Sequence, residues 1–220
     1  VPRDYQLQLL NVIEENPRGI VKSCTGSGKT LMCALVSAYL NKPTVIYTIG
    51  LDLLSQFYTL FQDVFPNEEI GYIGDGVCNP QRITICTIWS AARALKIDTK
   101  KLYEDDEIVD KEKFEENNAT KIVQCLKNAK IHMFDECHVA GCNSIAEIYK
   151  NIDPEHIYGF SGTPFKKDNA DMVITGILGE EIYEVTASAL IERKILAQPI
   201  IKFVPVPPMS LAMANYPTVY

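Results

Sequence analysis

The feature that most constrains this chain is a short run of small and polar residues between two apolar segments. Residues 19–22 have the composition of a buried strand, and residues 29–40 have the apolar periodicity of a helix. The run that joins them reads Ser23-Cys24-Thr25-Gly26-Ser27-Gly28-Lys29-Thr30. Glycines let successive backbone N–H groups converge on an anion at the positive end of a helix, so this order predicts a phosphate-binding loop.

The loop also predicts how a nucleotide and its metal ion are held. We expect Lys29 to reach the β and γ phosphates and Thr30 to offer its hydroxyl to Mg²⁺. The other candidate phosphate ligands are Thr25, Gly26, Ser27 and Gly28. The strict pattern has glycine where this chain has Ser23, so a small side chain must be tolerated there. The alternative is a glycine-rich helix entry beside an unrelated lysine, which the order of strand, loop and helix disfavours.

Two adjacent carboxylates follow a second apolar strand further along the chain. Residues 131–134 form that strand, and Asp135 and Glu136 come directly after it. In a parallel sheet this position is the carboxyl edge, where ligands bind. Asp135 is therefore a candidate to hold Mg²⁺, and Glu136 is a candidate to orient and deprotonate an attacking water. Taken alone, Asp135 fits equally well as the cap of the next helix.

Short apolar strands alternate with helices along most of the chain, which predicts an α/β fold with a mostly parallel sheet flanked by helices. We expect strands over residues 19–22, 44–47, 70–73, 83–86, 131–134, 156–160, 182–185 and 200–204. We expect helices over residues 4–14, 29–40, 51–64, 88–95, 121–128, 170–178 and 187–192. Residues 1–203 are predicted to form one domain, and the proline-rich residues 204–220 a linker or the start of a second one.

The charge balance argues at first against nucleic acid, because the net charge is −7. Residues 98–118 alone carry nine acids and four lysines, and the rest of the chain has 19 acids against 17 bases. We therefore expect an acidic insertion at 98–118, lying away from any nucleic-acid face. The alternative is a charged helical excursion. No stretch is apolar and long enough for a membrane span, and no signal peptide is visible.

The seven cysteines are odd in number and include no C-x-x-C pair, which is typical of a reduced intracellular protein. The cytoplasm is expected, or the host-cell cytoplasm for a viral protein. A zinc site is the weak alternative, because the candidate ligands match no standard zinc spacing: His132, Cys137, His138 and Cys142.

Several motifs, in order along the chain, resemble those of superfamily 2 helicases of the DExH branch. The phosphate loop, Asp135-Glu136-Cys137-His138 and Ser161-Gly162-Thr163-Pro164 are similar to motifs I, II and III of that family. Arg3-Asp4-Tyr5-Gln6 looks like its adenine-reading motif, and Thr87-Ile88-Trp89-Ser90 resembles motif Ib. The likeness is particularly to excision-repair and phage recombination helicases and to restriction-enzyme motor subunits. It implies a RecA-like P-loop domain, the first of two.

The resemblance also implies roles for single residues. Gln6, with Arg3 beside it, would hydrogen-bond the adenine edge, because a side-chain amide both donates and accepts. The alternative for Gln6 is an exposed glutamine on an amphipathic helix. His138, Ser161 and Thr163 would couple the state of the nucleotide to the nucleic-acid site. The alternative for Ser-Gly-Thr-Pro is a simple strand-ending turn, and both descriptions can hold together.

The nucleic-acid contacts implied by the resemblance are Gly50, Gln56, Thr87 and Ser90. The family's motif Ia has a threonine, and often a basic residue, where this chain has Gly50 and Leu51. Gly50 offers its backbone N–H but no hydroxyl, so we expect this motif to make fewer hydrogen bonds to the phosphates of the nucleic acid.

The resulting hypothesis is the ATP- and Mg²⁺-binding motor domain of an ATP-dependent helicase or translocase that acts on nucleic acid, DNA rather than RNA, with no membrane partner. A second RecA-like domain would supply an arginine finger, so we expect these 220 residues alone to bind ATP weakly and hydrolyse it slowly. The alternative is an ATP-gated module that binds nucleic acid or protein without separating strands. A small-molecule kinase is a remote third possibility, because it leaves the Ser-Gly-Thr-Pro motif unexplained.

Overall fold

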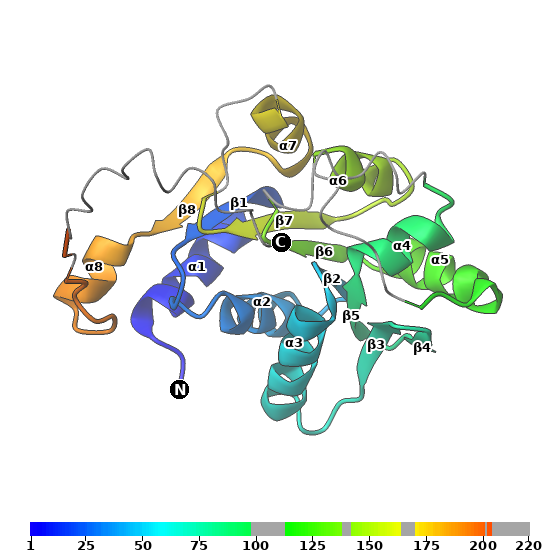
Figure 1. Cartoon of the computed structure of the whole chain (residues 1–220), viewed down its shortest axis with the longest axis horizontal. Coiled ribbons are helices and arrows are strands. Elements are labelled where there is room, and N and C mark those ends of the chain that lie inside the picture. The colour runs from blue at the N-terminus through cyan, green and yellow to red at the C-terminus, as the bar shows by residue number, and fades with distance from the viewer. Residues whose placement is uncertain (98–112, 138–141, 164–169, 201, 204–220) are drawn as a thin grey trace, which may run out of the picture.

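A computed structural model describes residues 1–97, 113–137, 142–163, 170–200 and 202–203. Its centre is one sheet with the strand order β4-β3-β5-β2-β6-β7-β1-β8, shown in Figure 1. All neighbouring strands are parallel except β3 and β4. The bounds are β1 (Arg18–Ser23), β2 (Thr44–Thr48), β3 (Ile70–Gly74), β4 (Val77–Asn79), β5 (Ile83–Thr87), β6 (Ile131–Asp135), β7 (His156–Ser161) and β8 (Glu181–Val185).

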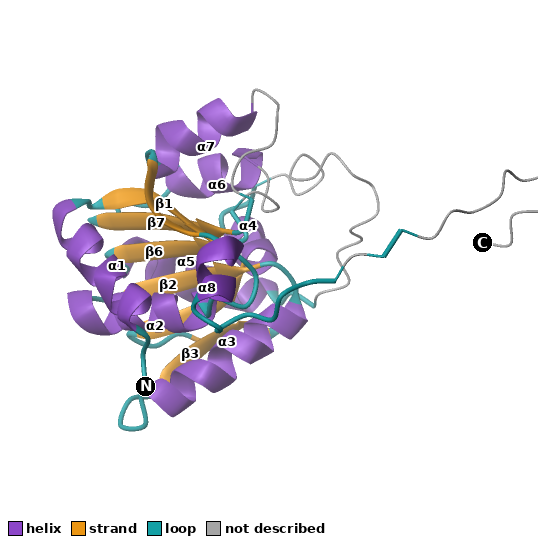
Figure 2. Cartoon of the chain, turned by 90° about the vertical axis from the view of Figure 1, so that its left-hand side faces the viewer, coloured by secondary structure: helices purple, strands orange, loops and turns teal. Residues whose placement is uncertain are grey.

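Helices cover both faces of the sheet, as Figures 1 and 2 show. One core lies between the sheet and the helices α1 (Asp4–Glu15), α2 (Lys29–Leu40) and α3 (Leu51–Val64). The other lies under α4 (Ile88–Ala94), α5 (Ala119–Asn128), α6 (Cys142–Tyr149) and α7 (Ala170–Leu178). The remaining helices are α8 (Ala187–Glu192) and a 3₁₀ turn, Glu116–Asn118. Among the residues with described placement, none of the helices has the length and apolarity to cross a membrane.

Strand β2 illustrates why its residues form a central strand. All five of its residues are buried, and alternate side chains enter different cores: Ile46 packs with α2 and α3, whereas Val45 and Tyr47 pack with α4 and α5. A strand buried on both faces favours a continuous run of β-branched and aromatic residues, which Thr44 to Thr48 supply.

The predicted α/β fold and mostly parallel sheet are confirmed, with seven of the eight predicted strands present. The strand predicted over residues 200–204 is wrong where the structure describes it. Ile200, Lys202 and Phe203 are not in a strand, and the side chains of Ile200 and Phe203 are 86% and 92% exposed. Apolar side chains alone do not make a strand without a neighbour to supply backbone hydrogen bonds.

Three elements have no counterpart among the predicted strands and helices: β4, α6 and the 3₁₀ turn Glu116–Asn118. The turn from β3 to β4 has positive φ at both Asp75 (49°) and Gly76 (81°), the geometry of a tight hairpin turn, for which Asp-Gly is a favoured pair. Most of the acidic segment, residues 98–112, lies outside the described residues, as do 204–220. At its described end, Lys113 N donates to Asp75 Oδ1 at 3.3 Å.

Candidate functional site

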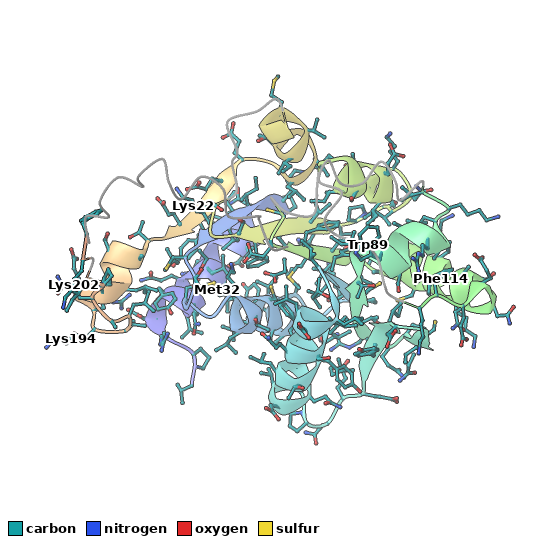
Figure 3. The ribbon with its side chains drawn as sticks, viewed as in Figure 1. Lys22, Met32, Trp89, Phe114, Lys194 and Lys202 are labelled. Atoms are coloured by element: carbon teal, nitrogen blue, oxygen red, sulfur yellow. The ribbon has the colours of Figure 1, made fainter. Side chains whose placement is uncertain are left out.

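The candidate phosphate loop joins β1 to α2, as the sequence predicts. Gly26 and Gly28 have φ of 81° and 85°, a backbone conformation that side-chain-bearing residues rarely adopt, so these two glycines permit the turn. Ser23 and Ser27 are fully buried, and their hydroxyls hydrogen-bond across the loop. Ser23 Oγ also contacts Met32 Sδ on α2 at 3.8 Å, and Met32 is labelled in Figure 3. The serine that departs from the strict pattern therefore braces the loop internally.

Helix α1 packs directly against this loop. Tyr5 Oη donates to the backbone oxygen of Ser27 at 2.7 Å, and Gln6 Nε2 donates to the same oxygen at 3.0 Å. Gln6 Oε1 accepts from the backbone N–H of Arg3 at 2.9 Å, so the amide is oriented from both ends. Gln6 is only 2% exposed, and the alternative of an exposed glutamine is wrong. A Cβ on Gly28 would lie 2.6 Å from Gln6 Nε2, so glycine is required for this approach.

The two carboxylates sit beside the loop at the end of β6. Lys29 Nζ and Glu136 Oε1 form an ion pair, and both side chains are mostly buried. Glu136 has φ of 46°, an uncommon conformation for a residue other than glycine, asparagine or aspartate, and such strain clusters at functional sites. The ion pair brings together the lysine and the acid that the sequence predicted independently.

Asp135 differs from its neighbour in its surroundings. It is 3% exposed, and its Oδ1 has no hydrogen-bond partner. Burial, and then the negative charge of Glu136, raise the pKa of Asp135 to about 6, although the charge of Lys29 acts in the opposite direction. A buried carboxylate oxygen without a partner fits a hard divalent cation, which prefers oxygen ligands. Thr30, the second candidate metal ligand, lies in the first turn of α2.

The end of β7 and the Ser161-Gly162-Thr163 turn that follows it contact both halves of this site. Ser161 ends β7 in register with Lys22 of β1, and its Oγ accepts from Thr163 N at 3.1 Å. A Cβ on Gly162 would lie 3.5 Å from the oxygen of Ser23, so the turn packs on the loop backbone. On the other side, Cys137 N donates to Phe160 O at 3.2 Å. His138 lies outside the described residues.

The candidate nucleic-acid residues lie at the carboxyl ends of β2 and β5. Gly50, with φ of 81°, precedes α3, and Gln56 is exposed on that helix. Thr87 caps α4 through a 3.1 Å hydrogen bond from Ser90 N, and both residues are buried. Thr87 and Ser90 thus hold the start of α4, and Gln56 has the freer side chain.

Two contacts to the loop were missed by sequence reasoning. Cys24 N donates to Val185 O of β8 at 3.1 Å, and a Cβ on Gly26 would lie 2.8 Å from Leu196 Cδ2. The segment after α8 therefore packs against the phosphate loop. The sequence predicts no separate role for Tyr5, yet its hydroxyl hydrogen-bonds the backbone of the phosphate loop. Nothing in the local sequence around Leu196 signals a contact with a residue so distant in the chain.

The zinc alternative is not tested, because two of its four candidate ligands, His138 and Cys142, lie outside the residues with described side chains. The described residues include no cluster of three or more His, Cys, Asp or Glu able to hold a metal. His132 is instead fully buried, with Nδ1 2.9 Å from Tyr47 Oη. The six cysteines with described side chains are free thiols.

A family model for "Type III restriction enzyme, res subunit" matches residues 1–166, which is well over half of the chain. The chain belongs to this family. The match agrees with the helicase motifs and with the parallel sheet that carries them, and the fold is that of a RecA-like domain of superfamily 2 helicases.

Two solved structures and one relative illustrate the likeness. The UvsW helicase of bacteriophage T4 has a TM-score of 0.61 at 21% identity, over 83% of this chain and 60% of that one. The Hef helicase domain of Pyrococcus furiosus has a TM-score of 0.59 at 18% identity, over 83% and 37%. UvrABC system protein B of Bacteroides fragilis is 41% identical over 61 residues, 28% of this chain and 9% of that protein. The chain thus spans only part of the length of these solved structures and of this relative.

Proposed function

We propose that this chain is the ATP-binding motor domain of an ATP-dependent DNA helicase or translocase. The observation that carries the proposal is the ion pair between Lys29 and Glu136 beside the buried Asp135, whose Oδ1 has no hydrogen-bond partner. A phosphate-binding lysine, a cation-binding carboxylate and a base thus converge on one edge of the sheet.

The roles follow from the surroundings of each side chain. The backbone N–H groups around Gly26 and Gly28 hold the phosphates, and Lys29 exchanges its partner Glu136 for phosphate oxygens. Released from the lysine, Glu136 accepts a proton from the attacking water. Thr30 and Asp135 are the residues that would hold Mg²⁺, which supplies positive charge to the phosphate oxygens when bound.

Other residues would bind adenine and couple the nucleotide to the nucleic-acid site. Gln6 keeps one amide N–H and one oxygen lone pair for adenine after its hydrogen bonds to Ser27 and Arg3, and Arg3 lies beside it. Ser161 and Thr163, with His138, would relay the loss of the γ-phosphate, because their turn packs on the phosphate loop. Motion of the loop would therefore reach β7 directly.

The partners are proposed on the family resemblance. Nucleic acid would lie across the carboxyl ends of β2 and β5, near Gly50, Gln56, Thr87 and Ser90, with DNA preferred to RNA. We propose residues 1–203 as the first RecA-like domain and 204–220 as the link to a second, which would supply the arginine finger. An odd number of cysteines without a C-x-x-C pair favours a reducing cytoplasm, of the host if the source is viral.

The test is displacement of a labelled strand by the intact protein, with DNA and RNA duplexes compared under the same salt. The proposal predicts ATP turnover that rises with DNA, together with strand displacement or, for a pure translocase, displacement of a bound protein roadblock. Turnover with neither kind of displacement would favour an ATP-gated binding module. No ATP binding at all would refute both. The 220 residues by themselves should bind ATP weakly and turn it over slowly.

A further inference from the structure

Two polar atoms at the carboxyl edge of the sheet are buried without a hydrogen-bond partner in the structure. One is Asp135 Oδ1, at the end of β6, and the other is Thr48 Oγ1, at the end of β2. Thr48 is fully buried. A native fold leaves few buried polar groups unpaired, and each costs roughly 1–3 kcal/mol, so each one calls for an explanation. No role for Thr48 follows from the motifs of the sequence.

The register places these two residues next to each other. Strands β2 and β6 are parallel, with Tyr47 opposite Phe134, and Thr48 and Asp135 occupy the next position of each strand. Neighbouring strands lie about 4.8 Å apart. The strands are therefore close enough for a hydroxyl and a carboxylate at this position to interact directly or through one water.

Both side chains also project from the same face of the sheet. Side chains two residues apart in a strand share a face, and Ile46 and Met133 precede Thr48 and Asp135 by two. Ile46 and Met133 pack together in the core under α1, α2 and α3, the side from which α2 carries Lys29 and Thr30. Thr48 thus lies on the nucleotide side of the sheet.

The chemistry of the two groups is complementary. The threonine hydroxyl donates one hydrogen bond, and an ionised carboxylate only accepts. On the other side of Thr48, its register partner Thr87 already accepts the N–H of Ser90 through Oγ1. Of these two neighbours of Thr48 on the flanking strands, Asp135 is the charged one, and a charged acceptor forms the stronger hydrogen bond.

We propose that Thr48 is a positioning residue for Asp135: in the Mg²⁺- and nucleotide-bound state its hydroxyl donates to the carboxylate, directly or through one water, and fixes the orientation in which Oδ1 faces the cation. This inference rests on the proposed function, because it assumes that Asp135 faces Mg²⁺. A hydrogen bond that fixes a metal-binding carboxylate typically raises metal affinity by ten- to a hundredfold.

The test compares Thr48→Val, which keeps the shape and removes the hydroxyl, with Thr48→Ser, which keeps the hydroxyl. In the intact protein, calorimetry measures binding of ADP with Mg²⁺ titrated in, and binding of ADP in EDTA. We expect Thr48→Val to need about tenfold more Mg²⁺ for the same ADP affinity, with binding in EDTA unchanged. Thr48→Ser should match the wild type. Without ligand, Thr48→Val should melt at the same temperature or higher, because the hydroxyl has no partner there.

Each of the other outcomes overturns the inference. Unchanged Mg²⁺ dependence in Thr48→Val overturns the inference and leaves the proposed function intact. A Thr48→Ser protein as weak as Thr48→Val shows that a hydroxyl at this position does not restore Mg²⁺ binding, and a lower melting temperature of unliganded Thr48→Val assigns the effect to general packing; either overturns the inference. A wild-type protein with no Mg²⁺-dependent ADP binding overturns the proposed function together with the inference.

Discussion

Lys29 and Glu136, which lie 107 positions apart in the chain, form an ion pair at the carboxyl edge of the sheet. The lysine begins α2 and the glutamate follows β6, so the contact depends on β1 and β6 flanking β7. Both side chains of the pair are mostly buried. Under the proposed function, nucleotide phosphates would compete with Glu136 for the same lysine.

Replacing Lys29 by Met should remove ATP binding. The ammonium group is the charged ligand that the loop offers to the phosphates, so we expect at least a tenfold rise in the Kd for ATP. Lys22→Met is the matched control, because Lys22 lies on β1 outside the loop and pairs with Glu184 of β8 at 2.6 Å. Its ATP affinity should stay at the wild-type value. Fluorescent-nucleotide titration measures both, and equal losses in the two variants would refute the role of Lys29.

Asp135→Asn should stabilise the unliganded protein while abolishing the Mg²⁺ dependence of nucleotide binding. The folded-state pKa of Asp135 is about 6, above the ordinary value of 3.8 for an aspartate. The charged form is therefore disfavoured by folding, and above pH 6 this costs about 3 kcal/mol. The cost declines as the pH falls from 6 and is absent below 3.8.

Urea unfolding at pH 8 and pH 5 without nucleotide tests this expectation. The gain in unfolding free energy should be about 1–3 kcal/mol at pH 8 and smaller at pH 5. The exposed Asp63 on α3 provides a control, and Asp63→Asn should change the stability by less than about 0.5 kcal/mol at both values. A destabilised Asp135→Asn protein at pH 8 would show that the carboxylate is satisfied in the folded state.

Gly26→Ala should destabilise the phosphate loop for two separable reasons. An alanine at φ of 81° is strained by about 1 kcal/mol, and its Cβ would lie 2.8 Å from Leu196 Cδ2. Gly76→Ala isolates the strain, because it has the same φ and only ordinary contacts. We expect Gly26→Ala to lose about 1–3 kcal/mol more than Gly76→Ala. Adding Leu196→Ala should recover part of that excess, and no recovery in the double-mutant cycle would contradict the contact.

The buried His132 should make the fold sensitive to mild acid. Burial lowers the folded-state pKa of His132 to about 4, from the ordinary value of 6.5 for a histidine. The unfolded chain therefore binds more protons between these values, and stability falls as the pH drops from 6.5 to 4, by roughly 3 kcal/mol in all. Tyr47 and His132 hydrogen-bond each other, so the Tyr47→Phe/His132→Phe double variant removes the titration without orphaning the phenol. The unfolding free energy of the double variant should therefore fall less between pH 6.5 and pH 4 than that of the wild type. The same fall in both proteins would contradict the role of His132.

The sequence alone pointed to those candidate site residues that belong to a recognisable local succession of strand, loop and helix. The strand, glycine loop and helix around Lys29 form one contiguous unit, and Asp135 follows a strand whose burial is visible in its own composition. The carboxyl ends of parallel strands lie at the same edge of a sheet, so Lys29 and Asp135 could be expected to lie close together.

The contacts that escaped prediction depend on which strands become neighbours. Thr48 is unremarkable in sequence, and only the pairing of β2 with β6 places it beside Asp135. Leu196 reaches Gly26 because β8 pairs with β1 and directs the chain back over the loop. Strand β4 has only three residues, so its composition gave too little signal against the adjacent turn.

The most direct test of the central claim is Glu136→Gln in the intact protein. The amide keeps the shape and a hydrogen-bonding oxygen but cannot accept the proton of water. With DNA present, steady-state turnover of ATP should fall at least a hundredfold, while the Kd for Mg·ATP stays within about threefold of the wild type. Glu147→Gln, on the exposed surface of α6, is the control and should leave both values unchanged. Wild-type turnover in Glu136→Gln would contradict the assignment of Glu136 as the base.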